Sequence, residues 1–388
     1  MRLPVVSNQV LLLKRLLLLI GTVVVLALAP SAAHAADVSV GCPRAPLGPY
    51  TYTSMFAALD KLDPSVPNTI TVKGICHDEP GLAGPGVQIV GFENLTIQTG
   101  PGEEARISEN QTSCVSTPVD RANAPALAIT DSHGLRLIGL IISGGRGVQI
   151  NESSVTGFGL TVENSFGNGI TVNAGSTLRL SGMLGDFHLP NIIQNNCGTG
   201  INVSYGSTLD LNFGSTVQGN GLGLGVQGSA NLNATADPSE QIRIQNNRGF
   251  GIAASGRVTF AGQVIVENNS VDPSAVFPAG VFVFGGEIHV NSSGLRILNN
   301  HGPGIWTLLQ STVRLGNPNP STPADITISG NTEEGLRLTQ MSMGWSFAGS
   351  AISGNTGAGV TCDVTSYLFG NVTGISANKC SNTVQDKK

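Results

Sequence analysis

Six residues occupy equivalent polar positions in six short runs in which apolar and polar residues alternate. In chain order they are Arg179, Asp210, Asn231, Thr259, His289 and Arg314. Aspartate and histidine are common general acids and bases, and arginine binds carboxylates. Glycosidases need two carboxylates beside the scissile bond, but no two carboxylates are neighbours in this row. We interpret the row as a solvated face with Arg179 beside Asp210, and keep catalysis as the alternative.

Three insertions carry further residues that could act in acid–base chemistry. These residues are Asp186, His188, Asp237 and Asp325, in the segments 185–188, 236–240 and 317–325. Loops on one flank of a repeat protein commonly form its binding wall, so these side chains could face one groove. The repeats between them have short corners, which separates the four side chains too far to share a proton or a metal ion. They are therefore weaker catalytic candidates, and we expect no metal site.

An aromatic pair is the third candidate. Phe282, Trp306 and Arg337 occupy outward positions in the first runs of three successive repeats. Two exposed rings one strand spacing apart would present a flat apolar face that suits a sugar ring or a protein surface. These residues are therefore candidates for ligand binding. The alternative is that the segment 270–279 folds over the rings and buries them.

All of these positions belong to a repeat. A glycine followed by alternating aliphatic residues returns every 22 to 31 residues. The nine glycines are Gly147, Gly169, Gly200, Gly223, Gly251, Gly280, Gly304, Gly335 and Gly359. Periods of about 20 to 50 residues are typical of solenoids, in which each repeat buries its apolar side only by stacking on its neighbours. The sequence therefore predicts one elongated solenoid.

Each repeat contains three runs with a period of two, separated by glycine, serine and asparagine, which predicts three strands joined by turns. Ile170 and Val172 are a typical inward pair of the first run, and Leu178 and Leu180 of the second. The third run usually ends in asparagine, which tolerates a left-handed backbone. Asparagines stacked at about 4.8 Å can hydrogen-bond in a ladder, so we expect one along the solenoid.

Three short strands per coil, an asparagine-bearing turn and second strands such as Gly-Ser-Thr-Leu-x-Leu resemble the repeats of the pectin-lyase-like superfamily. The resemblance covers roughly residues 66–380 and implies an all-β fold, a right-handed single-stranded parallel β-helix. The repeat itself predicts about eleven or twelve coils. That superfamily includes polysaccharide lyases, hydrolases, epimerases, tailspikes and adhesins, so the resemblance implies no particular activity. Its lyases and hydrolases cluster acids with a lysine or arginine on one strand face. Calcium would be expected only for such an enzyme, and no other cofactor is expected.

The N-terminus resembles an export signal. Arg2, Lys14 and Arg15 precede the apolar stretch 16–28, and residues 33–35 form a small-residue cleavage site. The sequence predicts that residues 1–35 are a signal peptide, that no membrane span is retained, and that the protein reaches the periplasm or the exterior. Cleavage would leave 17 basic and 25 acidic residues, a net charge of −8. This charge does not favour a nucleic acid as partner.

The ends of the solenoid need covers, because an open coil has unpaired strand edges. Ser54 precedes Met55, Phe56 and Leu59, which predicts a short capped helix. We expect residues 36–65 to be an N-terminal segment whose helix covers the first coil. The β-helix should occupy residues 66–380, and residues 381–388 should form a polar tail.

The chain has six cysteines, all in the exported part, and no Cys-x-x-Cys motif. An even number in an exported chain favours disulfides over a metal site. Among the fifteen connectivities, we favour Cys362 with Cys380 and Cys42 with Cys76. Cys114 and Cys197 form the remaining pair.

Two function classes remain open. The first is a non-catalytic exported protein that binds a polysaccharide or another cell-surface component, or that acts as a structural rod. The second is a polysaccharide-active enzyme, namely a uronate lyase or epimerase. The absence of paired acids favours the first class.

Overall fold

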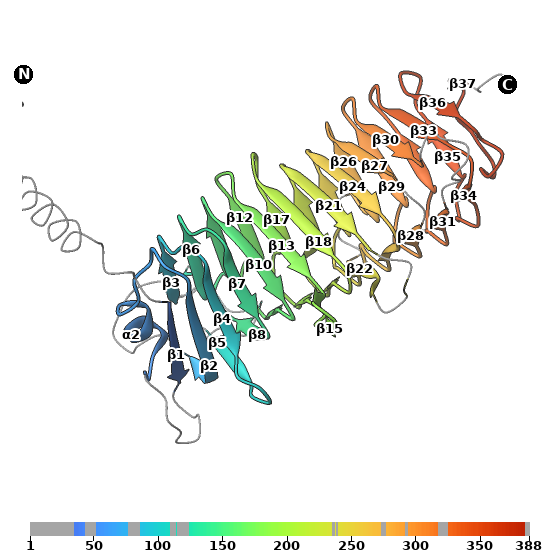
Figure 1. Ribbon diagram of the computed structural model, residues 1–388. Coiled ribbons are helices and arrows are strands. Elements are labelled where there is room, and N and C mark those ends of the chain that lie inside the picture. The colour runs from blue at the N-terminus through green and yellow to red at the C-terminus, as the bar shows by residue number, and fades with distance from the viewer. Residues whose placement is uncertain are drawn as a thin grey trace, which may run out of the picture.

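The computed structural model forms one elongated solenoid of stacked coils (Figure 1). It describes residues 35–42, 52–76, 86–108, 114, 124–234, 237, 240–272, 277–291, 294–316 and 325–384. The predicted signal peptide lies outside this range, apart from its last residue. No helix among the described residues is long and apolar enough to cross a membrane.

Each coil contributes one strand to each of three parallel faces, which we name first, second and third in chain order. The first face consists of β3 (Val87–Val90), β6 (Leu127–Thr130), β9 (Val148–Asn151), β12 (Ile170–Asn173), β17 (Thr199–Val203), β20 (Leu222–Val226), β23 (Ile252–Ala254), β26 (Val281–Phe284), β29 (Ile305–Leu308), β32 (Leu336–Leu338) and β35 (Val360–Cys362). Its eleven strands agree with the expected number of coils.

The second and third faces are joined in one sheet of 24 strands, because β2 (Asn68–Cys76) bends around a corner and belongs to both. The second face also holds β1 (Ala36–Gly41), β4 (Leu95–Thr99), β7 (Leu135–Ile138), β10 (Ser154–Phe158), β13 (Thr177–Ser181), β18 (Thr208–Asn212), β21 (Ser229–Asn233), β24 (Arg257–Ala261), β27 (Glu287–Val290), β30 (Thr312–Leu315), β33 (Met343–Ser346), β36 (Tyr367–Gly370) and β37 (Thr383–Val384). The third face also holds β5 (Ala105–Ser108), β8 (Leu140–Ser143), β11 (Thr161–Glu163), β16 (Ile192–Gln194), β19 (Thr216–Gln218), β22 (Ile242–Gln245), β25 (Val264–Glu267), β28 (Leu295–Leu298), β31 (Ile326–Ser329) and β34 (Ser350–Ile352).

The alternation of apolar and polar residues determines which side chains form the core. Ile170 and Val172 of β12, and Leu178 and Leu180 of β13, are almost completely buried, as the pattern predicts. Successive coils place equivalent residues in contact, since Leu178 pairs with Leu209 and Ile170 with Ile201 in parallel register. The core is therefore one continuous apolar column rather than a set of separate clusters.

The corner between the third and first faces contains the expected asparagine ladder. Its members are Asn196, Asn220, Asn247, Asn269, Asn300, Asn331 and Asn355. The Nδ2 of each asparagine donates to Oδ1 of the next, over 2.8 to 3.1 Å. The residue before each ladder asparagine is asparagine or glycine with φ between 53° and 69°, which turns the chain through the corner.

The repeating glycines are explained by this ladder. A methyl group at Gly280 would lie 2.7 Å from Nδ2 of Asn300 and 2.9 Å from the carbonyl oxygen of Gly304. Gly251 stands in the same relation to Asn269, and Gly304 to Asn331. Both distances are too short for a carbon atom, so only glycine lets the first strand begin beside the ladder.

The N-terminal cover has the predicted helix. α2 (Met55–Leu59) begins after Ser54, whose Oγ accepts a hydrogen bond from the Ala57 amide over 3.1 Å. Met55 and Ala58 are buried against the first coils, whereas Phe56 points to solvent. One boundary differs from the expectation. β1 lies in the predicted N-terminal segment but pairs along its whole length with β2, so the solenoid begins at Ala36.

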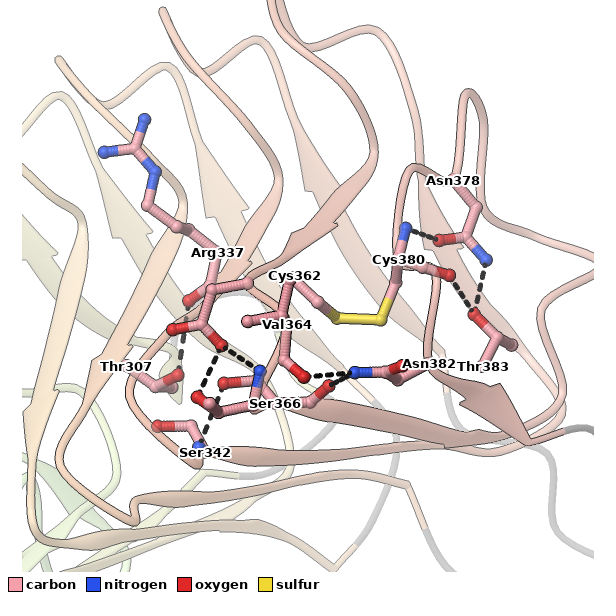
Figure 2. Close-up of a disulfide and its surroundings, with 12 residues drawn as sticks. Thr307, Arg337, Ser342, Cys362, Val364, Ser366, Asn378, Cys380, Asn382 and Thr383 are labelled. Atoms are coloured by element: carbon pink, nitrogen blue, oxygen red, sulfur yellow. Dashed lines mark hydrogen bonds between the residues drawn. A yellow bond between two sulfur atoms is a disulfide. The ribbon is translucent and has the colours of Figure 1, made fainter.

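The remaining pair, Cys114–Cys197, forms a disulfide, and so do the two favoured pairs, Cys42–Cys76 and Cys362–Cys380. Figure 2 shows the last of them beside the final coil. There Nδ2 of Asn382 donates to the carbonyl oxygens of Val364 and Ser366, both over 3.0 Å (Figure 2). β37 then pairs with β36, so the pairing extends into the segment expected to be a polar tail. Residues 385–388 of that segment lie outside the described part.

Candidate functional site

The second face carries the predicted row of polar side chains in register. Arg179 pairs with Asp210, Asp210 with Asn231, Asn231 with Thr259, Thr259 with His289, and His289 with Arg314. The row continues beyond both ends of the prediction. It extends back through Thr156 to Arg136, and forward to Trp345 and Phe369. The face therefore presents one line of side chains along the solenoid, at about 4.8 Å per coil.

The carboxylate in the middle of this row has a different partner from the one expected. Asp210 accepts a hydrogen bond from Nδ2 of Asn231 over 2.8 Å. Although Arg179 is adjacent to Asp210 in register, no ion pair joins them in the described structure. Arg179 is exposed and makes no ion pair with any described residue. Asp210 therefore pairs with Asn231 instead of with Arg179, and Arg179 has no ion-pair partner in the described part.

A charged cluster surrounds His289. Nε and Nη2 of Arg257 donate to Oε2 of Glu287 over 3.0 and 2.8 Å, and Nε2 of His289 lies 3.4 Å from the same oxygen. The hydrogen bond from Arg257 holds the pKa of Glu287 below its ordinary value. Burial lowers the pKa of His289. The positive charges of Arg257 and Arg314 lower this pKa further, whereas the negative charge of Glu287 raises it.

Several members of this site were not predicted from the sequence, namely Arg257 and Glu287 beside the row, and Arg136, Thr156, Trp345 and Phe369 in its extensions. Arg257 lies two residues before Thr259, and Glu287 lies two residues before His289. Residues two apart on a strand point to the same side, so this spacing could have predicted that both side chains point outward. Trp345 was not predicted because Gly344 occupies the inward position where the neighbouring strand has Val313. Without an aliphatic residue there, the sequence does not show the alternation of apolar and polar residues. The guanidinium of Arg314 lies 5.2 Å from the ring centroid of Trp345. Phe369 stacks on Trp345 with centroids 5.3 Å apart.

The first face places the predicted aromatic and basic residues on adjacent strands, but the two aromatic rings do not form the expected flat surface. Phe282 pairs with Trp306, and Trp306 with Arg337. The ring planes of Phe282 and Trp306 cross at 80°, so they do not form a flat face. Phe250 stacks on Phe282 with centroids 4.7 Å apart, and the guanidinium of Arg337 lies 4.9 Å from the Trp306 centroid. Neighbouring side chains therefore occupy ring faces that a sugar would need.

The segment 270–279 contributes to this enclosure. Phe277 lies 6.0 Å from Phe282 and 5.4 Å from Trp306, measured between ring centroids. Phe282 and Trp306 are half-buried. Their exposure is therefore intermediate between the two alternatives, an open binding face and rings buried under the segment 270–279. Residues 273–276 of the segment lie outside the described part. Arg337 is neutralised by Glu334, whose Oε2 lies 2.6 Å from its Nη2.

The residues of the three insertions have separate surroundings. Nε2 of His188 lies 3.5 Å from Oε1 of Glu240, and Asp325 pairs with Arg296 over 3.7 Å. Asp186 is exposed, and the backbone oxygen of Asp237 accepts a hydrogen bond from the Glu240 amide. Across the described ranges, no group of three or more histidine, cysteine, aspartate or glutamate side chains is placed to hold a metal ion.

Comparison with known proteins identifies the architecture. Residues 146–319 match the family model for the right-handed beta helix region. Together with the parallel sheets, this match shows that the described residues form a right-handed parallel β-helix. Curated protein sequences give no match. This β-helix has the fold that the resemblance to the pectin-lyase-like superfamily implies.

Solved structures similar to this β-helix differ in their described roles. Pectate lyase Pel9A is 14% identical, with 92% of this chain and 80% of that chain covered and a TM-score of 0.42. The A-module of mannuronan C-5 epimerase AlgE4 from Azotobacter vinelandii is 12% identical, with 83% and 91% covered and a TM-score of 0.41. Tailspike protein 3 of bacteriophage CBA120 is 10% identical, with 84% and 52% covered and a TM-score of 0.38.

Proposed function

We propose that this protein is an exported, non-catalytic β-helix that binds an acidic polysaccharide of a surface along its second face. The observation that carries the proposal is that three of the four arginines in the described strands of the second face have no ion-pair partner, the exception being Arg257 with Glu287, whereas every arginine in the described strands of the third face has one. Arg136, Arg179 and Arg314 of the second face are exposed, and none makes an ion pair within the described structure. They stand in a chain whose net charge is −5.

The third face provides the contrast. Its arginines are each paired with a carboxylate: Arg106 with Glu163 over 3.1 Å, Arg243 with Glu267 over 2.9 Å, and Arg296 with Asp325 over 3.7 Å. A guanidinium without a partner stays available for a carboxylate or sulfate, which it binds through two parallel hydrogen bonds. The second face is therefore the one on which a linear polyanion would find unsatisfied donors.

The aromatic end of the row fits a carbohydrate. Trp345 and Phe369 follow Arg314 in register, and Tyr367 lies beside Phe369 with 44% of its surface exposed. Aromatic side chains bind the apolar side of a sugar ring while an adjacent cation binds its acidic group. One line of residues thus offers both kinds of contact.

The carboxylates of the row support binding rather than catalysis. Asp210 and Glu287 stand on β18 and β27, three strands apart in the second face, so they do not flank one bond. Asp210 is held by Asn231, and Glu287 by Arg257. Export is supported by three disulfides, which form in oxidising compartments, and by the predicted signal peptide.

The test is a titration of the mature protein with alginate and polygalacturonate, with neutral dextran as the uncharged comparison. We expect binding of the two acidic polymers that weakens with added salt. The combined variant Arg136→Gln, Arg179→Gln and Arg314→Gln should lose about tenfold in affinity or more. The combined variant Arg106→Gln, Arg243→Gln and Arg296→Gln changes the net charge equally and should lose far less.

Two results would overturn the proposal. Equal losses in both combined variants would mean that net charge alone governs binding. Release of unsaturated sugars or new reducing ends from either acidic polymer, with or without calcium, would make the protein a polysaccharide-active enzyme. Thermal melts of each variant would show whether the fold is retained.

A further inference from the structure

The first face differs from the other two faces in its charge. Its nine strands from β3 to β29 contain no charged residue, and Arg337 of β32 is the only one in all eleven described strands of this face. The described strands of the other faces carry both signs of charge, for example in the pairs Arg257–Glu287 and Arg243–Glu267. Charged residues are depleted in the cores of interfaces between protein chains. The first face therefore has the composition expected of such an interface.

Three of the insertions belong to a corner that the first face does not share. The segments 185–188, 236–240 and 317–325 follow strands of the second face and precede strands of the third. The segment 270–279 does border the first face, and it places Phe277 beside Phe282 and Trp306. Phe277 is 46% exposed, so this segment adds an apolar ring to the surface of the first face.

The outward row of the first face places its smallest residues directly beside its largest. Gly225 pairs with Ala253, Ala253 with Phe282, and Phe282 with Trp306, all in parallel register. We call Gly225 and Ala253 the small pair, and Phe282 and Trp306 the aromatic pair. Above Gly225 there is only the end of a polar side chain, because Oδ1 of Asn202 would lie 2.9 Å from a methyl group there. Two coils without a bulky outward side chain thus adjoin two coils that carry aromatic rings.

We propose that the first face binds a second copy of this chain about a two-fold axis that runs parallel to the strands, between β23 and β26. The axis reverses the order of the coils, so the Phe282 ring of one copy lies over Ala253 of the other, and the Trp306 ring lies over Gly225. Such a contact is isologous, because each copy supplies the aromatic pair to one half and the small pair to the other. It also covers Phe284, the second outward residue of β26, which is 48% exposed in the single chain.

Area and charge select a second copy as the occupant. In this arrangement eight strands of each copy overlap, from β12 to β35. At about 4.8 Å per strand and about 13 Å along each strand, they cover roughly 500 Å² per copy and about 1,000 Å² in total. A specific protein interface needs about that area. The chain has a net charge of −5, and the first face brings two such copies together without opposing like charges. The second faces stay outside the contact, so this inference is independent of the proposed function.

Sedimentation velocity of the mature protein, from about 1 µM to about 100 µM, measures the association. We expect a dimer that Ala253→Arg weakens at least about tenfold, because the variant places a bulky charge in the contact. Ala128→Arg is the matched control. Ala128 lies in the same outward row, on β6, outside the overlapping strands, and the change in net charge is identical, so association should be unchanged. Both alanines are partly exposed, so thermal melts should show that both variants fold.

Cross-linking tests the two-fold axis itself. All six cysteines are in disulfides, so a thiol introduced by Ala253→Cys or Ala128→Cys is the only reactive one. Across the axis, the two copies of Ala253 lie about 11 Å apart, whereas those of Ala128 lie about 50 Å apart. A bismaleimide of about 11 Å should therefore join two chains of Ala253→Cys and none of Ala128→Cys.

Three results would contradict this inference. They are a protein that stays monomeric at every concentration, a dimer that Ala253→Arg leaves unchanged, and a cross-link between chains of Ala128→Cys. Binding of alginate or dextran by a monomer, lost in Ala253→Arg and retained in Ala128→Arg, would assign the first face to a polysaccharide instead. The arginine variants of the second face test the proposed function separately.

Discussion

The charge of His289 depends on its burial and on its charged neighbours. Burial lowers its pKa most, the nearby Glu287 raises it, and the positive charges of Arg257 and Arg314, from the strands on either side, lower it. Its lowered pKa keeps the imidazole neutral at neutral pH, and the lowered pKa of Glu287 keeps that carboxylate ionised. His289 and Glu287 thus keep the same charges across the neutral range.

A pH dependence of stability follows from these two shifts. Because the pKa of His289 is lower in the folded chain, the unfolded chain takes up a proton first as the pH falls below the ordinary value of 6.5. Stability should therefore decrease below that pH, and decrease again below 4.5 as the unfolded Glu287 is protonated. Urea unfolding at about pH 7.5 and about pH 5.5 measures the first step. His289→Gln should flatten the slope between them, and an unchanged slope in this variant would contradict the prediction.

Trp306 provides a second prediction at this scale. The ring is half-buried, and its contacts with Phe277, Phe282 and Arg337 would be lost in Trp306→Ala. Removing a fully buried tryptophan costs about 3 to 5 kcal/mol, so we expect a loss of about 2 kcal/mol in the free energy of unfolding. Urea melts measure it, with Phe284→Ala as the comparison, since Phe284 is 48% exposed and should cost less. A change near zero would mean that the ring is free in solution.

The sequence predicted which side chains point outward better than it predicted how those side chains are oriented and paired. The row from Arg179 to Arg314 was predictable because a strict period of two fixes which side chains point outward. The orientation of Trp306 relative to Phe282 was not, because it depends on Phe250 and Phe277, which come from a turn and a loop. Likewise, Asp210 accepts a hydrogen bond from Asn231 and makes no ion pair with Arg179, a choice between two neighbours that the sequence leaves open.

Among the elements, the asparagine corner contributes most to the uniformity of the coils. The side chain of Asn269 makes four hydrogen bonds inside the core. It donates to the carbonyl oxygen of Ile244 and to Asn300, and accepts from the side chain and the amide of Asn247. These bonds fix both the turn and the distance to the next coil. The ladder was predictable because asparagine recurs at the end of the third run.

Asn269→Ala tests this role. The substitution leaves several buried polar groups without partners, each at a cost of about 1 to 3 kcal/mol, so we expect a loss of about 3 to 4 kcal/mol in unfolding free energy. Gln245→Ala is the control. Gln245 also bonds to its neighbour, Gln218, over 2.9 Å, but on the partly exposed third face, so its loss should stay below about 1 kcal/mol. Equal losses, measured by urea unfolding, would mean that the ladder has no special role.

For the whole molecule, the free energy of local unfolding should differ from coil to coil along the solenoid axis. Each coil contacts only the coils beside it, so unfolding can begin at an end and spread. α2 protects the first coil, and the Cys362–Cys380 disulfide holds the segment that covers the last coil. Both ends therefore have a disulfide, Cys42–Cys76 at the N-terminal end and Cys362–Cys380 at the other, and the N-terminal end is also covered by the packing of α2.

Replacing both cysteines of one end by serine tests this description. In Cys362→Ser with Cys380→Ser, amide hydrogen exchange should increase in β35, β36 and β37 and remain unchanged in the coils near β13. The mirror variant, Cys42→Ser with Cys76→Ser, should instead increase exchange in β1 and β2. Mass spectrometry of peptides after exchange measures both. A uniform increase over all coils would show that the molecule unfolds as one unit.

The Cys114–Cys197 disulfide has a mechanical consequence. It joins residues 83 positions apart, across several coils of the solenoid. If a surface and a bound polymer pull on opposite ends of the protein, the chain between these cysteines cannot unravel while the bond is intact. A stretch of that length would otherwise release roughly 280 Å of slack. Under tension, this part of the protein would behave as an inextensible link, and its reach would change only when a reductant cuts the bond.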